Sequence, residues 1–514
     1  MAQEQTLQSL ARSATEMTFC YDDGVSLSAG LIMEDQNRNK VPLWGAIAPI
    51  AALIIFLTIN VRIFEDATAG ANQMVLLLSA AIAGVFGRIF GVPVASMMKG
   101  IVKSIAATTP AILVLLTIGA LAGTWMISGI VPAMVYYGLK VISPQWFLVA
   151  SVVVCGIVSV ATGSSWSTIA TVGVALIGIG QSLGIPAAMA AGAVISGAYF
   201  GDKVSPLSDT TNLAAAMAGA ELFTHIRHML WTTVPSIVIA LVVFGYLGAG
   251  YQSDLDPKVG PELSQVIEAK FNLTPWLLVV PLAVLVMVML KIDAVVALLT
   301  GAVLGALAAV LFQPDIVRAV AGDSGNYLRD AYVTCITALS SDVQLVTDHD
   351  AADELLNSSG MAGMLNTIWL ILCAMCFGGV MEACGMLRRL TEPMVHAAKS
   401  SGALITSTAG TCLFLNLTAS DQYLAIVVPG RMFRESFEDR ELAAENLSRT
   451  LEDAGTVTSV LVPWNTCGAM QASVLSVPVM AFAPWCIFNY VSPVMTIAFG
   501  WLGWTINKRE TRKV

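Results

Sequence analysis

Long apolar runs alternate with short polar segments along most of this chain. The runs lie near residues 42–61, 73–92, 109–128, 186–219, 232–250, 275–290, 293–312, 363–383, 454–478 and 481–504. A helix needs roughly 20 apolar residues to span a bilayer, and each run reaches or approaches that length. The runs at 186–219 and 454–478 are interrupted by polar residues. The pattern therefore predicts an all-α polytopic membrane protein of about ten transmembrane helices, two of them broken.

Two further runs, 145–184 and 402–430, are apolar on both arms and polar in the middle. Their centres are Thr162-Gly163-Ser164-Ser165 and Thr418-Ala419-Ser420-Asp421. A helix, a polar tip and a returning helix form a re-entrant hairpin, which is tolerated at membrane depth where protein or water surrounds the tip. Two full crossings per run is the alternative, but the arms look short for it. We expect two re-entrant hairpins.

The first broken run contains a polar stretch from Ser196 to Asn212. The apolar segments on either side are each too short to cross alone, which predicts that its charges lie at membrane depth. A charged side chain there costs at least roughly 2.5–3.5 kcal/mol on insertion scales, so it needs a partner or water. Gly201 and Pro206 provide means to interrupt a helix. Such a segment is typical of a transporter cation site, and the alternative is a polar loop between two short buried helices.

Polar and glycine positions of the first half recur in the second. Gly123, Gly129, Thr162 and Ser164 match Gly379, Gly385, Thr418 and Ser420 at a separation of 256, and Pro206 matches Pro463 at 257. Each half then has five crossings and one hairpin, and an odd number of crossings inverts the second copy relative to the first. We predict inverted repeats over 42–250 and 275–504, an extracytoplasmic linker over 251–274, and cytoplasmic tails at 1–41 and 505–514.

The remaining segments add less. Residues 93–107 read as an interfacial amphipathic helix carrying Lys99 and Lys103. Residues 431–452 are highly charged, which favours a cytoplasmic surface helix. The acidic loop near 342–354 is interpreted as solvated. His225 and His228 are three residues apart, and a surface position is preferred over a metal pair or a pH sensor.

Composition supports a membrane protein and excludes other classes. The 514 residues are 56% hydrophobic and 12% charged, against ~25% charged in soluble domains. A formal charge of −9 and the lack of a basic stripe argue against a nucleic-acid partner. Most of the 26 Lys and Arg residues fall on one side of the predicted layout, which places both termini in the cytoplasm. The sequence has no His-rich motif such as HExxH and no soluble catalytic domain, so we do not expect an enzyme.

The polar residues suit a small hard cation, because Na⁺ and Li⁺ prefer carboxylate, hydroxyl and carbonyl oxygens. We expect sodium at Asp209 with neighbouring hydroxyls. The candidate ion-binding and proton-coupling residues are Asp209, Asp202, Ser208, Thr210, Thr211, Ser205, Asn212, Lys203, Thr162, Ser164, Ser165, Ser420, Asp421, Asn465, Thr466 and Glu382.

Proton coupling requires a carboxylate whose pKa is raised by desolvation, so that sodium and protons compete for it. Asp209 is the first candidate, Asp202 the second and Asp421 the third. Glu382 is either a proton relay or an acid at a helix end facing water. Lys203 either pairs with the neighbouring Asp202 or snorkels toward a headgroup.

The phrase from Gly201 to Leu213, Gly-Asp-Lys-Val-Ser-Pro-Leu-Ser-Asp-Thr-Thr-Asn-Leu, closely resembles the signature of the NhaC-type sodium/proton antiporters. The resemblance extends through residues 161–168, 223–228 and 463–466 and covers the membrane region from 42 to 504. It implies the ion transporter superfamily fold, scaffold and transport domains, homodimers, an elevator-like motion, and exchange of external protons for internal sodium. The same family includes exchangers of organic acids such as malate and lactate, so the motif specifies the architecture better than the cargo.

We therefore expect a secondary active transporter that exchanges sodium or lithium for protons by alternating access in a bacterial plasma membrane. No cofactor is expected beyond the transported ions, and the expected partners are membrane lipids and a second copy of the chain. The close alternative is a sodium- or proton-coupled carrier of small organic acids. Such a carrier would need an Arg or Lys at its site, and Lys203 is the one available there. A cation channel is a more distant alternative.

Overall fold

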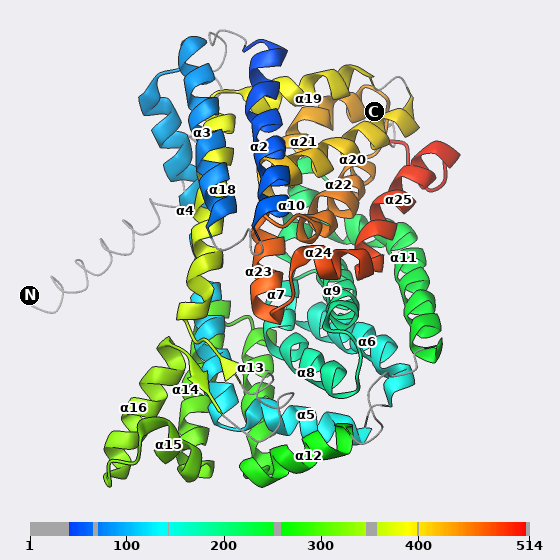
Figure 1. Ribbon diagram of the computed structural model, residues 1–514. Coiled ribbons are helices and arrows are strands. Elements are labelled where there is room, and N and C mark those ends of the chain that lie inside the picture. The colour runs from blue at the N-terminus through cyan, green and yellow to red at the C-terminus, as the bar shows by residue number, and fades with distance from the viewer. Residues whose placement is uncertain are drawn as a thin grey trace, which may run out of the picture.

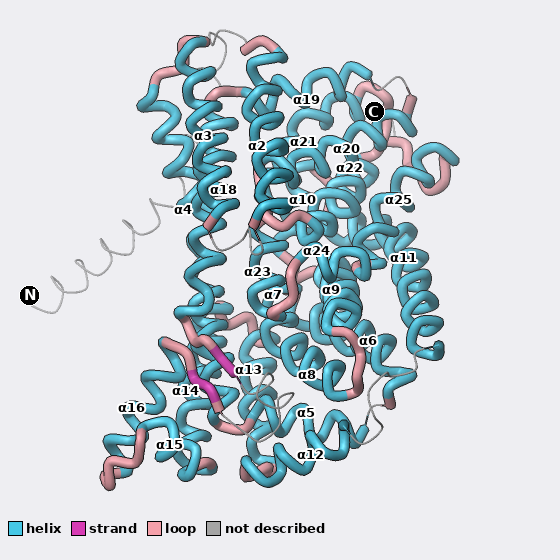
Figure 2. The backbone as a smooth tube through the Cα atoms, in the orientation of Figure 1, coloured by secondary structure: helices cyan, strands magenta, loops and turns pink. Residues whose placement is uncertain are grey.

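The computed structural model describes residues 41–64, 70–141, 143–250, 259–345, 357–397 and 400–509. These residues are almost entirely helical, as Figures 1 and 2 show. Within the described ranges, the strands are β1 (Val343–Gln344) and β2 (Asn357–Ser358), which pair antiparallel. The predicted N-terminal tail up to residue 40 and most of the acidic loop after Asp342 lie outside the described residues.

The first half of the chain forms a series of helices separated by short turns. They are α2 (Leu43–Ile63), α3 (Ala71–Ile89), α4 (Val94–Ile127), α5 (Ile130–Val141), α6 (Pro144–Thr162), α7 (Ser165–Thr168), the π-helix η2 (Ile169–Gly173), α8 (Val174–Ser182), α9 (Ala187–Val204), α10 (Asp209–Ala218) and α11 (Leu222–Gly250).

The second half continues in the same way. Its helices are α12 (Val259–Lys270), η3 (Pro275–Leu278), α13 (Val279–Met289), α14 (Ala294–Phe312), α15 (Pro314–Ala321), α16 (Tyr327–Ser340), η4 (Ala362–Met364), α18 (Leu365–Ala383), α19 (Met386–Ala397), α20 (Ser401–Thr418), α21 (Gln422–Glu438), α22 (Ala444–Leu451), the π-helix η5 (Glu452–Thr456), η6 (Ser459–Leu461), α23 (Thr466–Leu475), α24 (Val479–Phe482), η7 (Ala483–Trp485) and α25 (Ile487–Leu502).

Seven helices among the described residues are long and apolar enough to cross a membrane. They are α2, α3, α4, α6, α11, α14 and α18 together with η4. The pair formed by α23 and the segment Val479–Trp485 qualifies as an eighth, broken span, bent by 89°. The chain is thus a multi-pass membrane protein, and the layout of ten crossings with two re-entrant hairpins stays a prediction. Because α6 alone reaches crossing length at 19 residues, the shortness of the arms does not favour a hairpin there.

Two groups of helices lie side by side in Figure 1. α4 packs against α14 and α18, and α2 and α3 extend that group. The other group holds α6, α9, α10, α11 and α20 to α25. Within it, α20 and α21 occupy the upper part of the view and α6 and α8 the lower part, with α7 and α23 between them. The breaks between helices therefore gather at mid-height.

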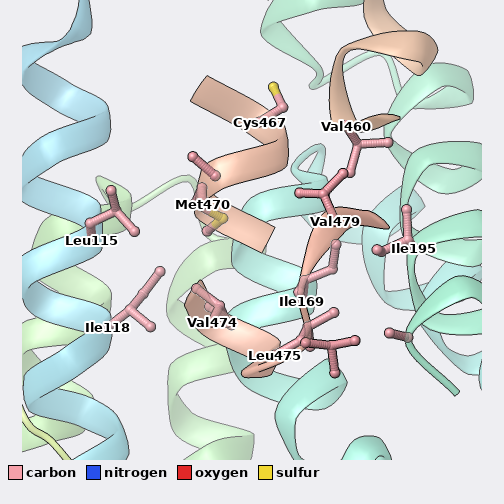
Figure 3. Packing of buried hydrophobic residues seen from close by; sticks show 14 of the residues in the cluster. Leu115, Ile118, Ile169, Ile195, Val460, Cys467, Met470, Val474, Leu475 and Val479 are labelled. Atoms are coloured by element: carbon pink, nitrogen blue, oxygen red, sulfur yellow. The ribbon is translucent and has the colours of Figure 1, made fainter. Parts of the chain in front are cut away.

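α23 joins these groups through apolar contacts. Figure 3 shows Met470, Val474 and Leu475 of α23 between the α4 side chains Leu115 and Ile118 and residues of η2 and α9. All these residues are buried.

Local chemistry explains the tips and breaks. α6 starts with Pro144 in its first turn and ends at Gly163, whose positive φ of 69° suits glycine. The corresponding turn after α20 places Ser420 at φ 60°, an uncommon conformation for a residue with a side chain. Gly129 and Gly385 also share positive φ values, of 77° and 68°. The positive φ recurs at a separation of 256 for Gly129 and Gly385 but at 257 for Gly163 and Ser420, and the inverted repeat stays a prediction.

Gly201 does not interrupt its helix, contrary to the sequence-based expectation. It lies inside α9, where an added Cβ would be 2.3 Å from the carbonyl oxygen of Gly156 on α6. Gly197 is equally close to the carbonyl oxygen of Val152. These glycines let α6 and α9 approach backbone to backbone, and the unwound part of the stretch is limited to residues 205–208.

Two segment predictions are wrong. The expected interfacial helix over 93–107 is the first part of α4, a continuous helix of 34 residues, although Lys99 and Lys103 are exposed as expected. The expected surface helix over 431–452 holds only for its first part. α22 and the start of η5 are buried, and Arg449 and Glu452 have no exposed surface. The charges of these residues therefore do not indicate a solvated helix, because neighbouring helices bury them.

Candidate functional site

The first half of the site is the break between α9 and α10. Pro206 cannot donate a backbone hydrogen bond, and α10 restarts at Ser208, whose side chain accepts from the backbone N–H of Thr211 at 3.3 Å. In the second half, α23 starts at Asn465, whose side chain accepts from the N–H of Cys467 at 3.0 Å. α21 starts at Asp421, which accepts from the N–H of Leu424 at 3.0 Å.

These breaks surround a cavity of about 250 Å³. Its lining residues come from α4, the start of α14, the two helix tips, the α9–α10 break and α23. They are Ala107, Thr108, Pro110, Ala111, Val114, Ser164, Trp166, Ser167, Asp202, Asp209, Ala294, Asp421, Gln422, Tyr423 and Thr466. We call this space the acidic cavity, because its described wall holds three carboxylates and no Lys, Arg or His.

Asp202 and Asp421 are equally buried, at 6% exposure, and Asp202 has a carboxylate oxygen without a partner. Its Oδ2 accepts from the backbone N–H of Ser165 at 3.0 Å and from the Ser165 hydroxyl at 2.6 Å. Its Oδ1 is buried and has no hydrogen-bond partner among the described residues. An unpartnered buried carboxylate oxygen at a cavity wall is suited to receive a cation or a proton.

Asp209, the first candidate from the sequence, lies at the cavity wall and is exposed. Its Oδ2 accepts from the Tyr423 hydroxyl at 2.5 Å, and its Oδ1 from the N–H of Thr210 at 2.8 Å. Tyr423 belongs to α21, so this bond links the α9–α10 break to the second tip. The neighbouring hydroxyls of Ser208 and Thr210 face each other at 3.1 Å rather than Asp209.

Some of the other predicted residues line the cavity, and the rest form hydrogen bonds within the segments that surround it. Asp421, Ser164 and Thr466 line it. Thr466 also donates its N–H to the carbonyl of Ser420 at 3.0 Å, which joins α23 to the second tip. Asn465 donates to Asn416, and Thr162 lies 3.3 Å from the Thr168 hydroxyl. Ser205, Thr211 and Asn212 donate to the carbonyls of Val160, Lys203 and Pro206. Their hydroxyls and amide thus serve the local backbone.

Lys203 and Glu382 lie away from the cavity. Lys203 is fully buried and pairs with Asp453, not with Asp202, and it also donates to Ser492 at 2.8 Å. The pairing with Asp202 and the snorkelling orientation are both wrong. Glu382 pairs with Lys103 at 3.2 Å, with one-third of its side chain exposed. It therefore has a partner on α4 at the surface.

Sequence reasoning missed several side chains. Tyr423 is two residues beyond a predicted tip, and its proximity to Asp421 was the available signal. Glu452 and Asp453 stood at the edge of a charged segment interpreted as solvated, and only their position next to an apolar run could have marked them. His225 and His228 are buried, which overturns the surface assignment. His225 lies 2.7 Å from the hydroxyl of Ser448, while no cluster of three metal-ligating side chains occurs in the described part of the chain.

A helical chain with several apolar spans, interrupted helices and carboxylates gathered where the interruptions meet has the architecture of a secondary transporter. Residues 197–504 match the Na⁺/H⁺ antiporter family, and the chain belongs to that family, within its NhaC type.

Curated relatives cover most of the chain. It is 37% identical over 438 residues to the Na⁺/H⁺ antiporter NhaC of Alkalihalophilus pseudofirmus, covering 85% of this chain and 91% of the relative. It is 37% identical over 416 residues to NhaC of Bacillus subtilis, covering 80% and 88%. A malate-2H⁺/Na⁺-lactate antiporter of Bacillus subtilis is 33% identical over 468 residues, covering 90% and 96%.

Proposed function

We propose that this protein exchanges Na⁺ or Li⁺ for H⁺ across a bacterial plasma membrane, with the cation held in the acidic cavity. Membership of the Na⁺/H⁺ antiporter family supports the reaction. The observation that carries the assignment to this site is the buried, unpartnered Oδ1 of Asp202, a residue that lines a cavity whose described wall has three carboxylates and no cationic side chain.

Charge favours a cationic cargo. Negative groups taken out of water need compensation by a cation or by protonation. Lys203, the cation that an organic acid would use, is engaged by Asp453 and does not line the cavity. A Na⁺ ion would combine one carboxylate with neutral oxygens such as the hydroxyls of Ser164, Ser167 and Tyr423, because Na⁺ prefers hard oxygen ligands.

Protons and Na⁺ compete for the same carboxylate in this proposal. When Asp202 is ionised, its free oxygen binds Na⁺ together with the neutral oxygens of the wall. When it is protonated, the cavity loses the charge that holds the metal ion. Binding of one species therefore excludes the other, which is the basis of exchange.

Alternating access is assigned to the boundary between the two helix groups. α4 supplies one wall of the cavity through Thr108, Pro110 and Val114, and the group with α9 and α21 supplies the carboxylates. Movement of the second group past α4 would expose the cavity to each side in turn, as in an elevator. A homodimer in which α2 to α4 belong to a static scaffold fits this motion, with both termini in the cytoplasm.

Flux measurements test the reaction. The full-length protein is reconstituted in liposomes that contain a pH dye, and Na⁺, Li⁺, K⁺ and malate are added in turn. We expect saturable H⁺ movement with Na⁺ and Li⁺ and none with K⁺ or malate. H⁺ movement driven by malate alone would contradict the proposal, and Na⁺ flux without any counter-ion would indicate a channel.

Exchange of small organic acids is the second candidate. The malate-2H⁺/Na⁺-lactate antiporter relative favours it, and a cavity of about 250 Å³ is larger than a bare metal ion needs. The absence of a cationic group among the described lining residues weighs against it. The malate arm of the experiment separates the two.

A further inference from the structure

Glu452 is a buried acid outside the acidic cavity. It has no exposed surface, and neither carboxyl oxygen has a hydrogen-bond partner among the described residues. It is the first residue of the π-helix η5, Glu452–Thr456. Short π-helical segments are uncommon, and they frequently occur at functional sites.

Part of the charge around Glu452 has partners other than Glu452. Lys203 of α9 pairs with Asp453, which also accepts from the Thr232 hydroxyl of α11 at 2.8 Å. Arg449 of α22 donates through Nη1 to the Thr505 hydroxyl at 2.9 Å, while its Nε and Nη2 are buried and, among the described residues, have no hydrogen-bond partner, as is the case for the Glu452 oxygens. Asp202 of α9 and Cys412 of α20 also interact electrostatically with Glu452, and His225 and His228 lie on α11. An ionised carboxylate buried without a partner is very costly, so this packing suits the neutral acid.

We propose that Glu452 is a proton-binding residue, a site for H⁺ separate from the acidic cavity. The inference rests on the proposed exchange. In one step the Glu452 carboxylate takes up a proton and becomes a neutral acid, and in the reverse step it releases that proton. When it is ionised, Lys203 is the nearby cation that it shares with Asp453.

The position of Lys203 couples this site to the cavity. Asp202 and Lys203 are consecutive in the last turn of α9, with Asp202 at the cavity and Lys203 at Asp453. A change of charge at Glu452 alters the field on Lys203, and any shift of that turn alters Asp202. Protonation at one side of α9 thus biases cation binding at the other.

Polar residues continue from this cluster to the surface. The buried face of α11 carries Thr232, which binds Asp453, and then His228 and His225. His225 lies 2.7 Å from Ser448, and His228 lies 3.4 Å from Asn507. Asn507 lines a second cavity of about 790 Å³ at the surface, together with Glu445 and Arg509. This arrangement offers protons a route that does not cross the acidic cavity.

Two assays on one liposome preparation test the proposal. The first measures Na⁺-driven H⁺ movement, and the second measures ²²Na⁺/Na⁺ exchange, which moves no net proton. In Glu452→Gln, which resembles the protonated acid in shape and charge, we expect H⁺ movement to fall roughly 100-fold, the contribution of a positioned proton-transfer group. We expect ²²Na⁺/Na⁺ exchange to remain. The matched control is Glu435→Gln, at an exposed position of α21, which should leave both unchanged.

The outcomes separate this proposal from the proposed function. Unchanged H⁺ movement in Glu452→Gln, or loss of both activities in a correctly folded variant, would overturn the role of Glu452. If Glu452→Gln does not accumulate, Glu452→Asp keeps a carboxyl group, and a shifted pH profile of H⁺ movement is then expected. An unshifted profile would overturn the proposal. Wild-type protein inactive in both assays would contradict the proposed function itself.

Discussion

The last turn of α9 contacts two acidic regions, the acidic cavity at Asp202 and the buried ion pair of Lys203 with Asp453. The two regions differ in how their negative charge is compensated. Asp202 faces the acidic cavity, where a wall of hydroxyls and two further carboxylates surrounds it without a cationic side chain among the described residues. One residue later, Lys203 meets Asp453 in a fully buried ion pair with Ser492 and Thr232 as further partners. The acidic cavity has space for an ion and no cationic side chain among its described lining residues. The region around Asp453 is closely packed, and Lys203 provides its cation.

This difference indicates a division of labour. An uncompensated acidic cavity gains free energy from a cation that arrives from outside, so it suits the transported ion. A compensated buried pair gains nothing from such an ion, and breaking it leaves a charge without a partner. Under the proposed function, Asp202 binds the cargo, while the neighbouring Lys203 stabilises the buried charges on the other side of the helix.

The largest expected effect is on the cavity side. Asp202→Asn replaces the carboxylate by a neutral amide. The amide carries no charge to hold Na⁺ and does not take up a proton, so we expect neither ion to bind there. We expect Na⁺-driven H⁺ movement in everted vesicles to fall roughly 100-fold or more, as when a positioned proton-transfer group is removed. The amount of folded protein should stay the same.

Asp315→Asn is a suitable control for that variant, because Asp315 is an exposed residue of α15. It should exchange ions as the wild type does. Wild-type exchange in Asp202→Asn would remove Asp202 from the site.

The next effect is expected on the packed side. Lys203→Met leaves Asp453 buried without its cation, and breaking a buried pair in this way costs roughly 3–5 kcal/mol. We expect a lowered unfolding temperature of the purified protein in detergent. The double variant Lys203→Met/Asp453→Asn should recover much of the loss, because the orphaned charge is gone. An unfolding temperature equal to the wild type in the single variant would contradict a role of this pair in stability.

A smaller effect is expected from the bond that links the two halves at the cavity. Tyr423→Phe removes the hydroxyl that donates to Asp209 at 2.5 Å. A hydrogen bond to a charged group contributes roughly 1.5–3 kcal/mol. Because the Tyr423 hydroxyl is among the proposed Na⁺ ligands, the apparent Na⁺ affinity should fall about tenfold. The Na⁺ concentration dependence of H⁺ movement measures it, and an identical half-saturating concentration would argue against any contribution of this bond.

The smallest effect concerns Glu382. It pairs with Lys103 near the surface, and exposed pairs contribute about 0–1 kcal/mol. Glu382→Gln should therefore leave both exchange and unfolding temperature close to wild type. A strong loss of exchange would instead place Glu382 on the proton path.

The sequence predicted the positions of most helices, because membrane spans are specified by local hydropathy. The breaks at residues 205–208 and before Thr466 were also found, since Pro206, Ser208 and Asn465 act on their own neighbourhood. The placement of Asp202, Asp209 and Asp421 around one space agrees with the expected convergence of tips and breaks.

What failed in the sequence reasoning depends on contacts between distant residues. Lys203 and Asp453 are 250 positions apart, and no spacing rule connects them. Charged residues such as Arg449 and Glu452 usually indicate a solvent-exposed helix, yet neighbouring helices bury both side chains completely. Gly201 was interpreted as a helix breaker because its other use, close approach to Gly156, requires knowing which helix lies next to it.

The glycine contacts between α6 and α9 constrain how the molecule works. Carbonyl oxygens of α6 occupy the space where side chains of α9 would otherwise lie, and Ser165 donates two hydrogen bonds to Asp202. This close packing opposes sliding of the two helices against each other. In the alternating-access cycle proposed above, we therefore expect the first tip and Asp202 to move as one rigid unit. The same proposal predicts that the cavity opens on the opposite wall, along α4, where Pro110 interrupts the regular hydrogen bonding of a long helix.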